Sequence, residues 1–468
     1  MIRGGLLALI LLLSFVAHSQ RTEQNLIHTD IQSYFVGDWS GDLRFDRYHL
    51  PVAFEIDTSE GTFYNPVQNP QKVSLDSIIY RDTTLYLYIH QLTFLVHPIS
   101  KNRAGGSMIE GKDTIPFDLY RNKMISPPDR PQHPDTLFDY DVKEVTFVNT
   151  DADITLAGTL TIPRNEPTVF VILLSGSGPQ DRDETLMHHK PFAVLADFLT
   201  ESGLGVLRYD DRGVAKSTGS HNTATSYNFA EDAAAAYRFL GSKYPDAKIG
   251  FLGHSEGGII AQIADSLVQG AAFHIYLAGP GLDIIDLMIE QNRQVLQATM
   301  SEETLEVYLN GLRPIFEIIT DDGEFDERQA SLNDLAKQLY SSLSPEEAKA
   351  LAPSDVFYAM SISQLLYLKW WPYFLGYQPK QYLSQIKCSI LALNGSRDIQ
   401  VTPDNLKAIK SFADKADVTI VELEQHNHLF QKCTNCNLRE YGMLTQTLSS
   451  ETLTTIKEWL SQKYFISQ

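Results

Sequence analysis

The sequence has few cysteines and few positive charges for its length. Its 468 residues include three cysteines, too few for a disulfide framework, so folding must depend on a hydrophobic core. Lysine and arginine number 38 against 58 aspartates and glutamates, which gives a formal net charge of −20. Phosphate backbones and anionic lipids repel a surface this acidic. Nucleic-acid binding is therefore disfavoured.

Long apolar runs are also scarce, and the one that stands out lies at the N-terminus. Arg3 precedes an apolar stretch over residues 6–16, and Ala17 and Ser19 supply the small residues of a cleavage site. This pattern predicts a signal peptide over residues 1–19 and an exported protein, periplasmic or secreted, that is soluble after cleavage. The run is too short for a transmembrane helix, and a retained signal anchor is the alternative. We expect no other membrane span.

Residues 30–125 have the pattern of β-strands. Leu85, Leu87 and Ile89 alternate with polar or aromatic neighbours, as in a half-buried strand. Turn signals separate several such runs, and no helical stretch of useful length is found. We therefore predict a small antiparallel β-domain, either a sandwich or a barrel. The proline-rich segment 126–137 is typical of a linker, because proline lacks a backbone donor and favours extended chain.

Residues 138–468 alternate between strand and helix patterns. Continuous apolar runs such as residues 169–174 (VFVILL) suit strands that are covered on both faces. Helical patterns such as residues 192–199 lie between them. This alternation predicts an α/β fold with a doubly wound, mostly parallel sheet. Residues of about 284–380 are helical, acidic and without a clear strand, which predicts a helical lid over the carboxyl ends of the strands.

The clearest chemical motif is GHSEG at residues 253–257. It follows a predicted strand at residues 248–252 and precedes a predicted helix. A G-x-S-x-G motif in that setting forms a strained turn that lifts the serine hydroxyl above the sheet. Glycines are needed because neighbouring backbone leaves no room for a Cβ there. Ser255 is therefore the candidate nucleophile, and a glycine-rich turn with a capping serine is the alternative.

A serine nucleophile needs a base and an acid that orients the base. In a fold of this kind the acid comes next in the sequence, just after a late strand. Asp398 follows the predicted strand at residues 389–393 and is the candidate acid. Asp283 and Asp286, which follow the preceding strand, are the alternatives.

Two histidines follow the last predicted strand, residues 418–423, and either could act as the base. His428 is favoured because the apolar Leu429 and Phe430 can pack and hold its ring in one orientation. His426 is then interpreted as an exposed loop residue.

Acyl transfer also needs backbone donors for the oxyanion. The first candidate is the N–H of Glu256, directly after the nucleophile. The second lies in the loop at residues 175–183, where small residues let the backbone approach a substrate. The N–H of Ser177 is the preferred choice there, with Gly176 as the alternative. This loop lacks the lysine of a phosphate-binding P-loop.

Five motifs together resemble those of bacterial α/β-hydrolases. The most similar group is the exported serine carboxylesterases with an N-terminal β-domain, which are related to dienelactone hydrolases and prolyl-oligopeptidase-like enzymes. The resemblance covers about residues 140–468. It is carried by SGSGPQDRD (175–183), YDDRG (209–213), GHSEG (253–257), NGSRD (394–398) and NHLF (427–430).

The resemblance implies that Ser255, Asp398 and His428 form a catalytic triad and that the chain hydrolyses small carboxylic esters through an acyl-enzyme. It implies neither a metal nor an organic cofactor. Ser175 departs from the pattern, since many relatives carry histidine at that position. Two other functions stay open: a serine peptidase on the same triad, and a carbohydrate-binding module with an accessory esterase. About one hundred N-terminal residues are too few for the propeller of prolyl oligopeptidases.

Two further features are less specific. Trp371 and Phe374 belong to an aromatic cluster at the end of the predicted lid. Packing in the core is the default for such a cluster, and the wall of an apolar acyl pocket is the alternative. Cys433 and Cys436 lack the second ligand pair of a metal site, so a local disulfide that braces the histidine loop is one possibility.

Overall fold

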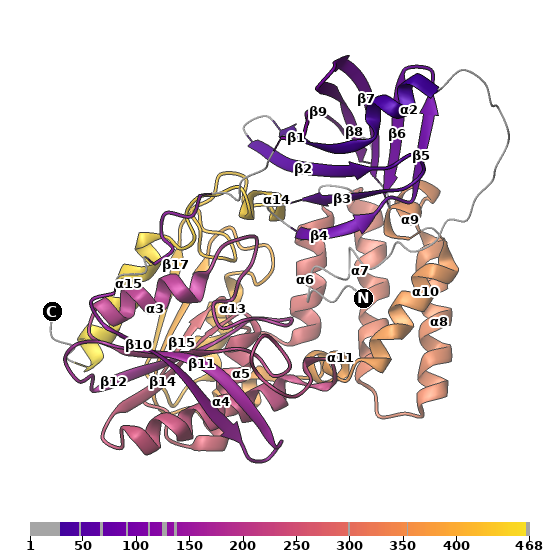
Figure 1. Cartoon of the computed structure of the whole chain (residues 1–468). Helices are drawn as coiled ribbons and strands as arrows, with labels where there is room; N and C mark the ends of the chain where they lie inside the picture. Colours follow the sequence, from indigo (N-terminus) through magenta and orange to yellow (C-terminus); the bar gives the residue numbers. More distant parts are fainter. Residues whose placement is uncertain are drawn as a thin grey trace.

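The computed structural model describes residues 29–45, 48–65, 69–89, 92–110, 113–123, 129–134, 138–297, 300–352 and 354–464. The predicted signal peptide and part of the predicted linker lie outside the described residues. The chain has two separate hydrophobic cores, one inside the N-terminal β-domain and one that runs through the second sheet and the lid. Figure 1 shows the β-domain above the lid helices, with the second sheet beside them.

The N-terminal domain is one nine-stranded antiparallel sheet in the order β4-β3-β2-β1-β9-β8-β7-β6-β5. Its edge strands, β4 and β5, are joined by Leu75 and Asp76 alone, so the sheet curls until its edges approach each other. Leu75 N–H donates to Gly61 O (2.9 Å), and Asp76 N–H donates to Tyr88 O (2.8 Å). The predicted antiparallel β-domain is confirmed, as a curled sheet and not a sandwich. Its strands are β1 (Gly37–Phe45), β2 (Tyr48–Ile56), β3 (Gly61–Asn65), β4 (Asn69–Ser74), β5 (Ser77–Arg81), β6 (Thr84–Ile89), β7 (Leu92–Ser100), β8 (Arg103–Glu110) and β9 (Asp113–Arg121).

The core of this domain follows from the alternation of its strands. In β6 the side chains of Leu85, Leu87 and Ile89 are buried, and the residues between them are partly exposed. A short helix, α2 (Thr29–Phe35), precedes the sheet, although the sequence pattern predicted no helix there. Tertiary contact explains it: the Tyr34 hydroxyl donates to the carbonyls of Ser100 (2.6 Å) and Arg103 (2.8 Å), and the buried Phe35 belongs to the core of the sheet.

The second sheet has eight strands in the order β10-β11-β13-β12-β14-β15-β16-β17. Its first two strand pairs are antiparallel and the other five are parallel. Every residue of β12 is buried, as expected for a strand covered on both faces. The predicted mostly parallel α/β sheet is confirmed. Its strands are β10 (Asp141–Asn149), β11 (Ile154–Ile162), β12 (Val169–Leu174), β13 (Gly205–Tyr209), β14 (Lys248–His254), β15 (Phe273–Leu277), β16 (Ser389–Gly395) and β17 (Val418–Leu423).

Helices cover both faces of this sheet. Helices α3 and α15 contact each other, whereas α4, α5, α12 and α13 form a second connected row. Amphipathic spacing explains the packing: Phe192, Leu195 and Leu199 on α3 are spaced three or four residues apart, and all are buried. The helices are α3 (Pro191–Glu201), α4 (Ser226–Lys243), α5 (Glu256–Val268), α12 (Pro379–Leu383), α13 (Asp404–Phe412), α14 (Leu438–Tyr441) and α15 (Ser450–Tyr464), with a short 3₁₀ helix at His221–Thr223.

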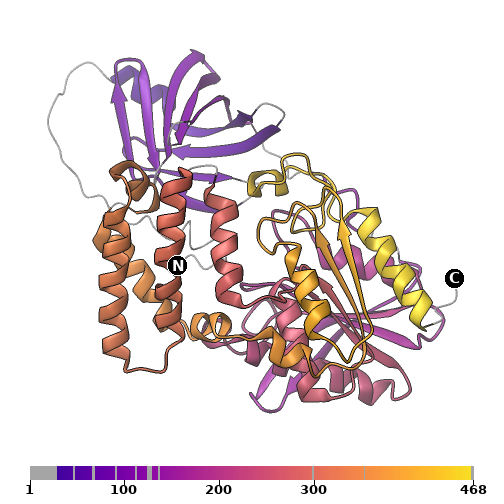
Figure 2. The ribbon, with the colours of Figure 1, turned by 180° about the vertical axis from the view of Figure 1, so that it is seen from behind.

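The segment that the sequence predicts as a lid, called the lid below, lies between β15 and β16 and is helical. Figures 1 and 2 both show its long helices beside the second sheet and below the β-domain. Its apolar side chains belong to the same core as the sheet. No helix among the described residues is both long and apolar enough to cross a membrane. The lid helices are α6 (Ile284–Leu296), α7 (Glu302–Thr320), α8 (Phe325–Ser342), α9 (Pro345–Leu351), α10 (Asp355–Gln364) and α11 (Trp370–Leu375), with a 3₁₀ helix at Leu365–Tyr367.

Candidate active site

Ser255 lies at a sharp turn between β14, which ends at His254, and α5, which begins at Glu256. Its backbone has φ 54° and ψ −121°, a strained conformation for a residue with a side chain. Glycines make the turn possible. A Cβ at position 253 would lie 2.1 Å from Gly257 O, and one at position 257 would lie 2.1 Å from Leu174 O. The local geometry is therefore that of a nucleophile elbow.

Asp398 and His428 are brought together by the loops that follow β16 and β17. His428 Nδ1–H donates to Asp398 Oδ2 over 2.8 Å, and both side chains are buried. The other carboxylate oxygen, Oδ1, accepts backbone hydrogen bonds from Gln400 (2.8 Å) and Val401 (3.0 Å). These bonds fix the carboxylate so that Oδ2 faces the imidazole. The arrangement can hold one tautomer of His428, with Nε2 left as the basic nitrogen.

The two alternative acids are engaged elsewhere. Asp283 caps α6 by accepting from the N–H of Ile285 (3.0 Å). Asp286 forms an ion pair with Arg313 on α7 (2.6 Å). Both carboxylates thus stabilise the lid, and neither has a hydrogen bond to His428 among those found in the described part of the chain.

His426 is not an exposed loop residue, and that expectation was wrong. Its side chain is 0% exposed. Its Nδ1 donates to Glu424 O (2.7 Å), and Ser449 Oγ lies 2.7 Å from its Nε2. The loop folds back on itself through a bridge between His426 and Lys432, which carries the ring inward. Such a long-range closure leaves no local pattern in the sequence.

The loop after β12 lies directly against the elbow. A Cβ at position 176 would be 3.3 Å from Ser255 Cβ and 3.4 Å from His254 O. The N–H of Gly176 donates to Glu184 Oε1 (2.7 Å) and is therefore already engaged. This leaves the backbone N–H groups of Ser177 and Glu256 as the candidate oxyanion donors. Acyl transfer requires such donors beside the nucleophile.

A buried network that sequence reasoning missed ties the elbow to the histidine loop. Glu184 Oε1 accepts from His254 Nδ1 (2.9 Å), and His254 Nε2 donates to His428 O (3.0 Å). Burial alone would lower the pKa of His254, but the charge and hydrogen bond of Glu184 and the carbonyl of His428 outweigh it and raise the pKa. His254, the residue directly before Ser255, thus links Glu184 to the backbone of His428.

The lid reaches the elbow through Trp370. Its Nε1–H donates to Glu256 Oε1 (2.7 Å), which also accepts from Ser226 Oγ (2.6 Å). Burial raises the pKa of Glu256, although these donors and the Ser177 hydroxyl favour its charged form. Trp371 and Phe374, for which core packing was the default prediction and a pocket wall the alternative, are buried in the core. Phe374 stacks on Trp370 with ring centroids 4.4 Å apart. The sequence could not show that Trp370, and not Trp371 or Phe374, makes this contact, because all three lie on one short helix.

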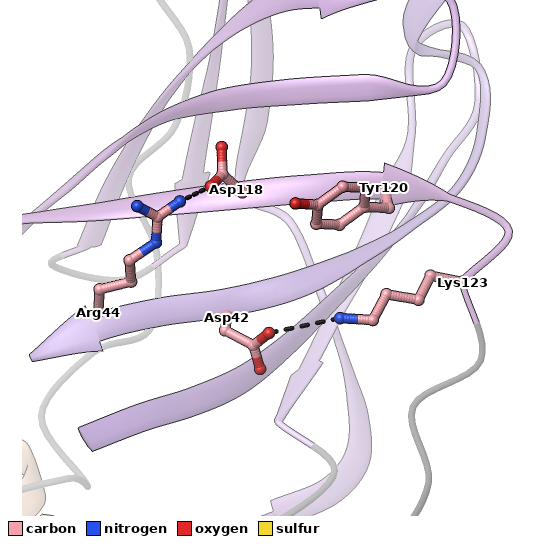
Figure 3. A pocket seen from close by; sticks show the side chains of 5 residues that line it. All are labelled: Asp42, Arg44, Asp118, Tyr120 and Lys123. Atoms are coloured by element: carbon pink, nitrogen blue, oxygen red, sulfur yellow. Dashed lines mark hydrogen bonds and ion pairs between the residues drawn. The ribbon is translucent and has the colours of Figure 1, made fainter. Parts of the chain in front are cut away.

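A hollow of about 420 Å³ lies on the β-domain and not at the elbow. Figure 3 shows that its charges are paired: Arg44 with Asp118, and Lys123 with Asp42 at 3.4 Å. Tyr120 completes the lining. Because its charged groups neutralise one another, this hollow offers no unpartnered nucleophile or base, and we assign no chemistry to it.

Known proteins are similar to parts of this chain. Residues 185–351 match the model of a hydrolase family described as serine aminopeptidase, S33. The esterase EstD of Thermotoga maritima is 26% identical over 286 residues, and the match spans 60% of this chain and 60% of the length of that relative. Two solved structures are similar at low identity. An esterase of Pyrococcus furiosus is 17% identical, with a TM-score of 0.43 over 73% of this chain and 98% of its own. A proline iminopeptidase of Mycobacterium smegmatis is 18% identical, with a TM-score of 0.42 over 69% of this chain and 98% of its own.

The elbow follows β14, the acid loop follows β16 and the histidine loop follows β17, in the order that the α/β-hydrolase fold requires. The mixed, mostly parallel eight-stranded sheet completes that architecture. The C-terminal part of the chain therefore has the mixed, mostly parallel sheet of the α/β-hydrolase fold, and an all-antiparallel β-domain precedes it.

Proposed function

We propose that this chain is a serine esterase that hydrolyses carboxylic esters through an acyl-enzyme. The observation that carries the proposal is the strained elbow at Ser255 together with the 2.8 Å hydrogen bond between His428 and Asp398. The similarity to an esterase of Thermotoga maritima supports the choice of substrate class.

The first half of the mechanism makes the acyl-enzyme. Ser255 Oγ attacks the ester carbonyl carbon while His428 Nε2 takes the hydroxyl proton. Asp398 holds the imidazole and stabilises the cation that forms. The N–H groups of Glu256 and Ser177 stabilise the negative oxygen of the tetrahedral intermediate. The bond to the alcohol then breaks, and the alcohol leaves with the proton from His428.

The second half releases the acid. Water attacks the acyl carbon and gives a proton to His428. The bond between the acyl carbon and Ser255 Oγ breaks, and Ser255 regains its proton from the imidazole. The carboxylic acid leaves, and the protein returns to its starting state. Every proton is carried by residues of this chain, and no cofactor enters the scheme.

A serine peptidase is the second candidate, favoured by the description of the family that matches residues 185–351. An aminopeptidase needs a carboxylate free to bind the substrate's amine. Glu256 is the acid nearest the nucleophile in the sequence, but its Oε1 already accepts hydrogen bonds from Ser226 and Trp370. This engagement favours an ester over a peptide with a free N-terminus.

The two candidates separate in one assay. The purified chain is given p-nitrophenyl esters of graded acyl length and, in parallel, aminoacyl p-nitroanilides, with Ser255→Ala as the blank. We expect higher kcat/KM for the esters than for any anilide. Faster turnover of an aminoacyl anilide, absent in Ser255→Ala, would replace the esterase proposal with a peptidase.

We also infer export, on the signal-peptide pattern over residues 1–19. The disulfide between Cys433 and Cys436 supports an oxidising compartment. Mass spectrometry of the protein made in a bacterial host with its native N-terminus would test this. A mature chain that begins at Gln20 is expected, and an uncleaved chain retained in the cytosol would contradict export.

A further inference from the structure

A second cluster of reactive side chains lies at the opposite edge of the sheet from Ser255. Asp265 comes from the last turns of α5, His274 from the start of β15, and Cys388 directly precedes β16. One ligand atom from each of the three lies within 4.8 Å of the other two. The elbow lies at the carboxyl end of β14, whereas this cluster lies where β15 and β16 begin. The proposed hydrolysis does not use it.

His274 is the unusual member of the cluster. Its side chain is 0% exposed, and its polar neighbours are the Asp265 carboxylate and the Cys388 thiol. Neither ring nitrogen has hydrogen-bond geometry to a described residue, whereas buried imidazoles normally make well-formed hydrogen bonds. Its Nε2 lies 3.4 Å from Asp265 Oδ1. Asp265 and Cys388 are half-buried, so two of the three groups are partly open to solvent.

We propose that Asp265, His274 and Cys388 bind one Zn²⁺, with water as the fourth ligand. Thiolate, imidazole and carboxylate are the ligand types that zinc takes, whereas a thiolate argues against Mg²⁺ and Ca²⁺. Nitrogen and oxygen ligands that are each ~2.0–2.1 Å from zinc in a tetrahedron are about 3.4 Å apart. The separation of His274 Nε2 and Asp265 Oδ1 matches this value.

The placement would let the ion join three elements of the fold away from the elbow. Zinc would fasten the C-terminal part of α5 to β15 and to the start of β16. Helix α5 begins at Glu256, directly after the nucleophile, so the ion would brace the far end of the element that forms the elbow. The sequence carried no metal motif because the three ligands are 9 and 114 residues apart (274 − 265 and 388 − 274).

Cobalt substitution tests the site without relying on catalysis. The full chain is freed of metal with a chelator and titrated with Co²⁺. We expect one equivalent to bind, with a thiolate-to-cobalt charge-transfer band and the visible bands of tetrahedral cobalt. Cys388→Ser should remove the charge-transfer band, and Asp265→Asn should weaken binding by at least about tenfold. Zn²⁺ should raise the Tm of the wild-type chain and not that of Cys388→Ser.

The double variant Cys433→Ser/Cys436→Ser is the matched control, because it removes the sulfurs of the other two cysteines and should keep both the band and the Tm shift. If the wild-type chain shows neither the charge-transfer band nor the Tm shift, the proposal is overturned and the cluster is an ion pair beside a thiol. Asp265→Asn is conservative and its side chain is partly exposed, so it keeps the test decisive even if Cys388→Ser folds poorly.

Discussion

At the scale of single residues, the account depends on one tautomer of His428. Asp398 Oδ2 accepts from its Nδ1, and two backbone N–H groups hold the carboxylate in place. In Asp398→Asn the amide can present a donor to Nδ1 and favour the wrong tautomer. We expect kcat for ester hydrolysis to fall by about four orders of magnitude while the Tm changes little. Asp283→Asn is the control and should retain activity. Activity that is retained in Asp398→Asn and lost in Asp283→Asn would identify Asp283 as the acid.

The pair of His254 and Glu184 makes stability depend on pH. The pKa of His254 is raised in the folded chain, against about 6.5 when unfolded. Its protonated ring donates to both Glu184 and His428 O. The pair therefore contributes its full stabilisation below about pH 6.5, and that contribution is lost as pH rises through the folded pKa.

The free energy of unfolding, measured in urea at a series of pH values, checks this sign. The difference between wild type and His254→Gln should be largest at acidic pH and should shrink as pH rises. A difference that grows with pH, or that stays constant, would mean that His254 is neutral in the folded chain.

At the scale of elements, two neighbouring tryptophans on α11 are expected to have different roles. Trp371 is buried in the core, whereas Trp370 is half-buried and donates to Glu256. Trp371→Ala should destabilise the fold by about 3–5 kcal/mol and reduce kcat/KM equally for acetyl and longer esters. Trp370→Phe keeps most of the ring but loses the donor, so it should alter ester kinetics with a smaller Tm change. Selective loss of long-chain esters in Trp371→Ala would instead make Trp371 a pocket wall.

The elements also show what the sequence could predict. The strand at residues 169–174 and the G-x-S-x-G turn are visible because apolar runs and glycines report local backbone geometry. Asp398 and His428 could be named as candidates because each follows an apolar run that predicts a strand, and the structure places the two within hydrogen-bond distance. Contacts between residues that are far apart in the sequence could not be predicted. Glu184 and His254 are 70 residues apart, and the burial of His426 depends on a loop closing over Ser449. Neither has a local signature.

At the scale of the whole molecule, the linker between the two domains is anchored beside the histidine loop. The buried Arg130 donates to the carbonyls of Leu444 (2.7 Å), Gly442 (2.7 Å) and Met187 (3.0 Å). Met443, in the same segment, packs against the core of the β-domain. The β-domain is thus coupled to the segment that follows His428.

Arg130→Met tests this coupling. It would leave carbonyls without donors, at about 1–3 kcal/mol for each buried group, so we expect a clearly lower Tm and a reduced kcat for ester hydrolysis. Arg164→Met is the control, because that side chain is 74% exposed and pairs only with Asp139 among the ion pairs found in the described residues. Equal effects of the two substitutions would show that the linker contact does not support the site.

The most direct test of the central claim is covalent labelling of the wild-type chain with a fluorophosphonate, followed by peptide mass spectrometry. The account predicts one adduct per chain, on Ser255, with ester hydrolysis lost in proportion to labelling. Ser255→Ala should take up no label and should lose about 10⁴–10⁶-fold in kcat with an unchanged Tm. An adduct on another serine, or full ester hydrolysis after complete labelling of Ser255, would contradict the account.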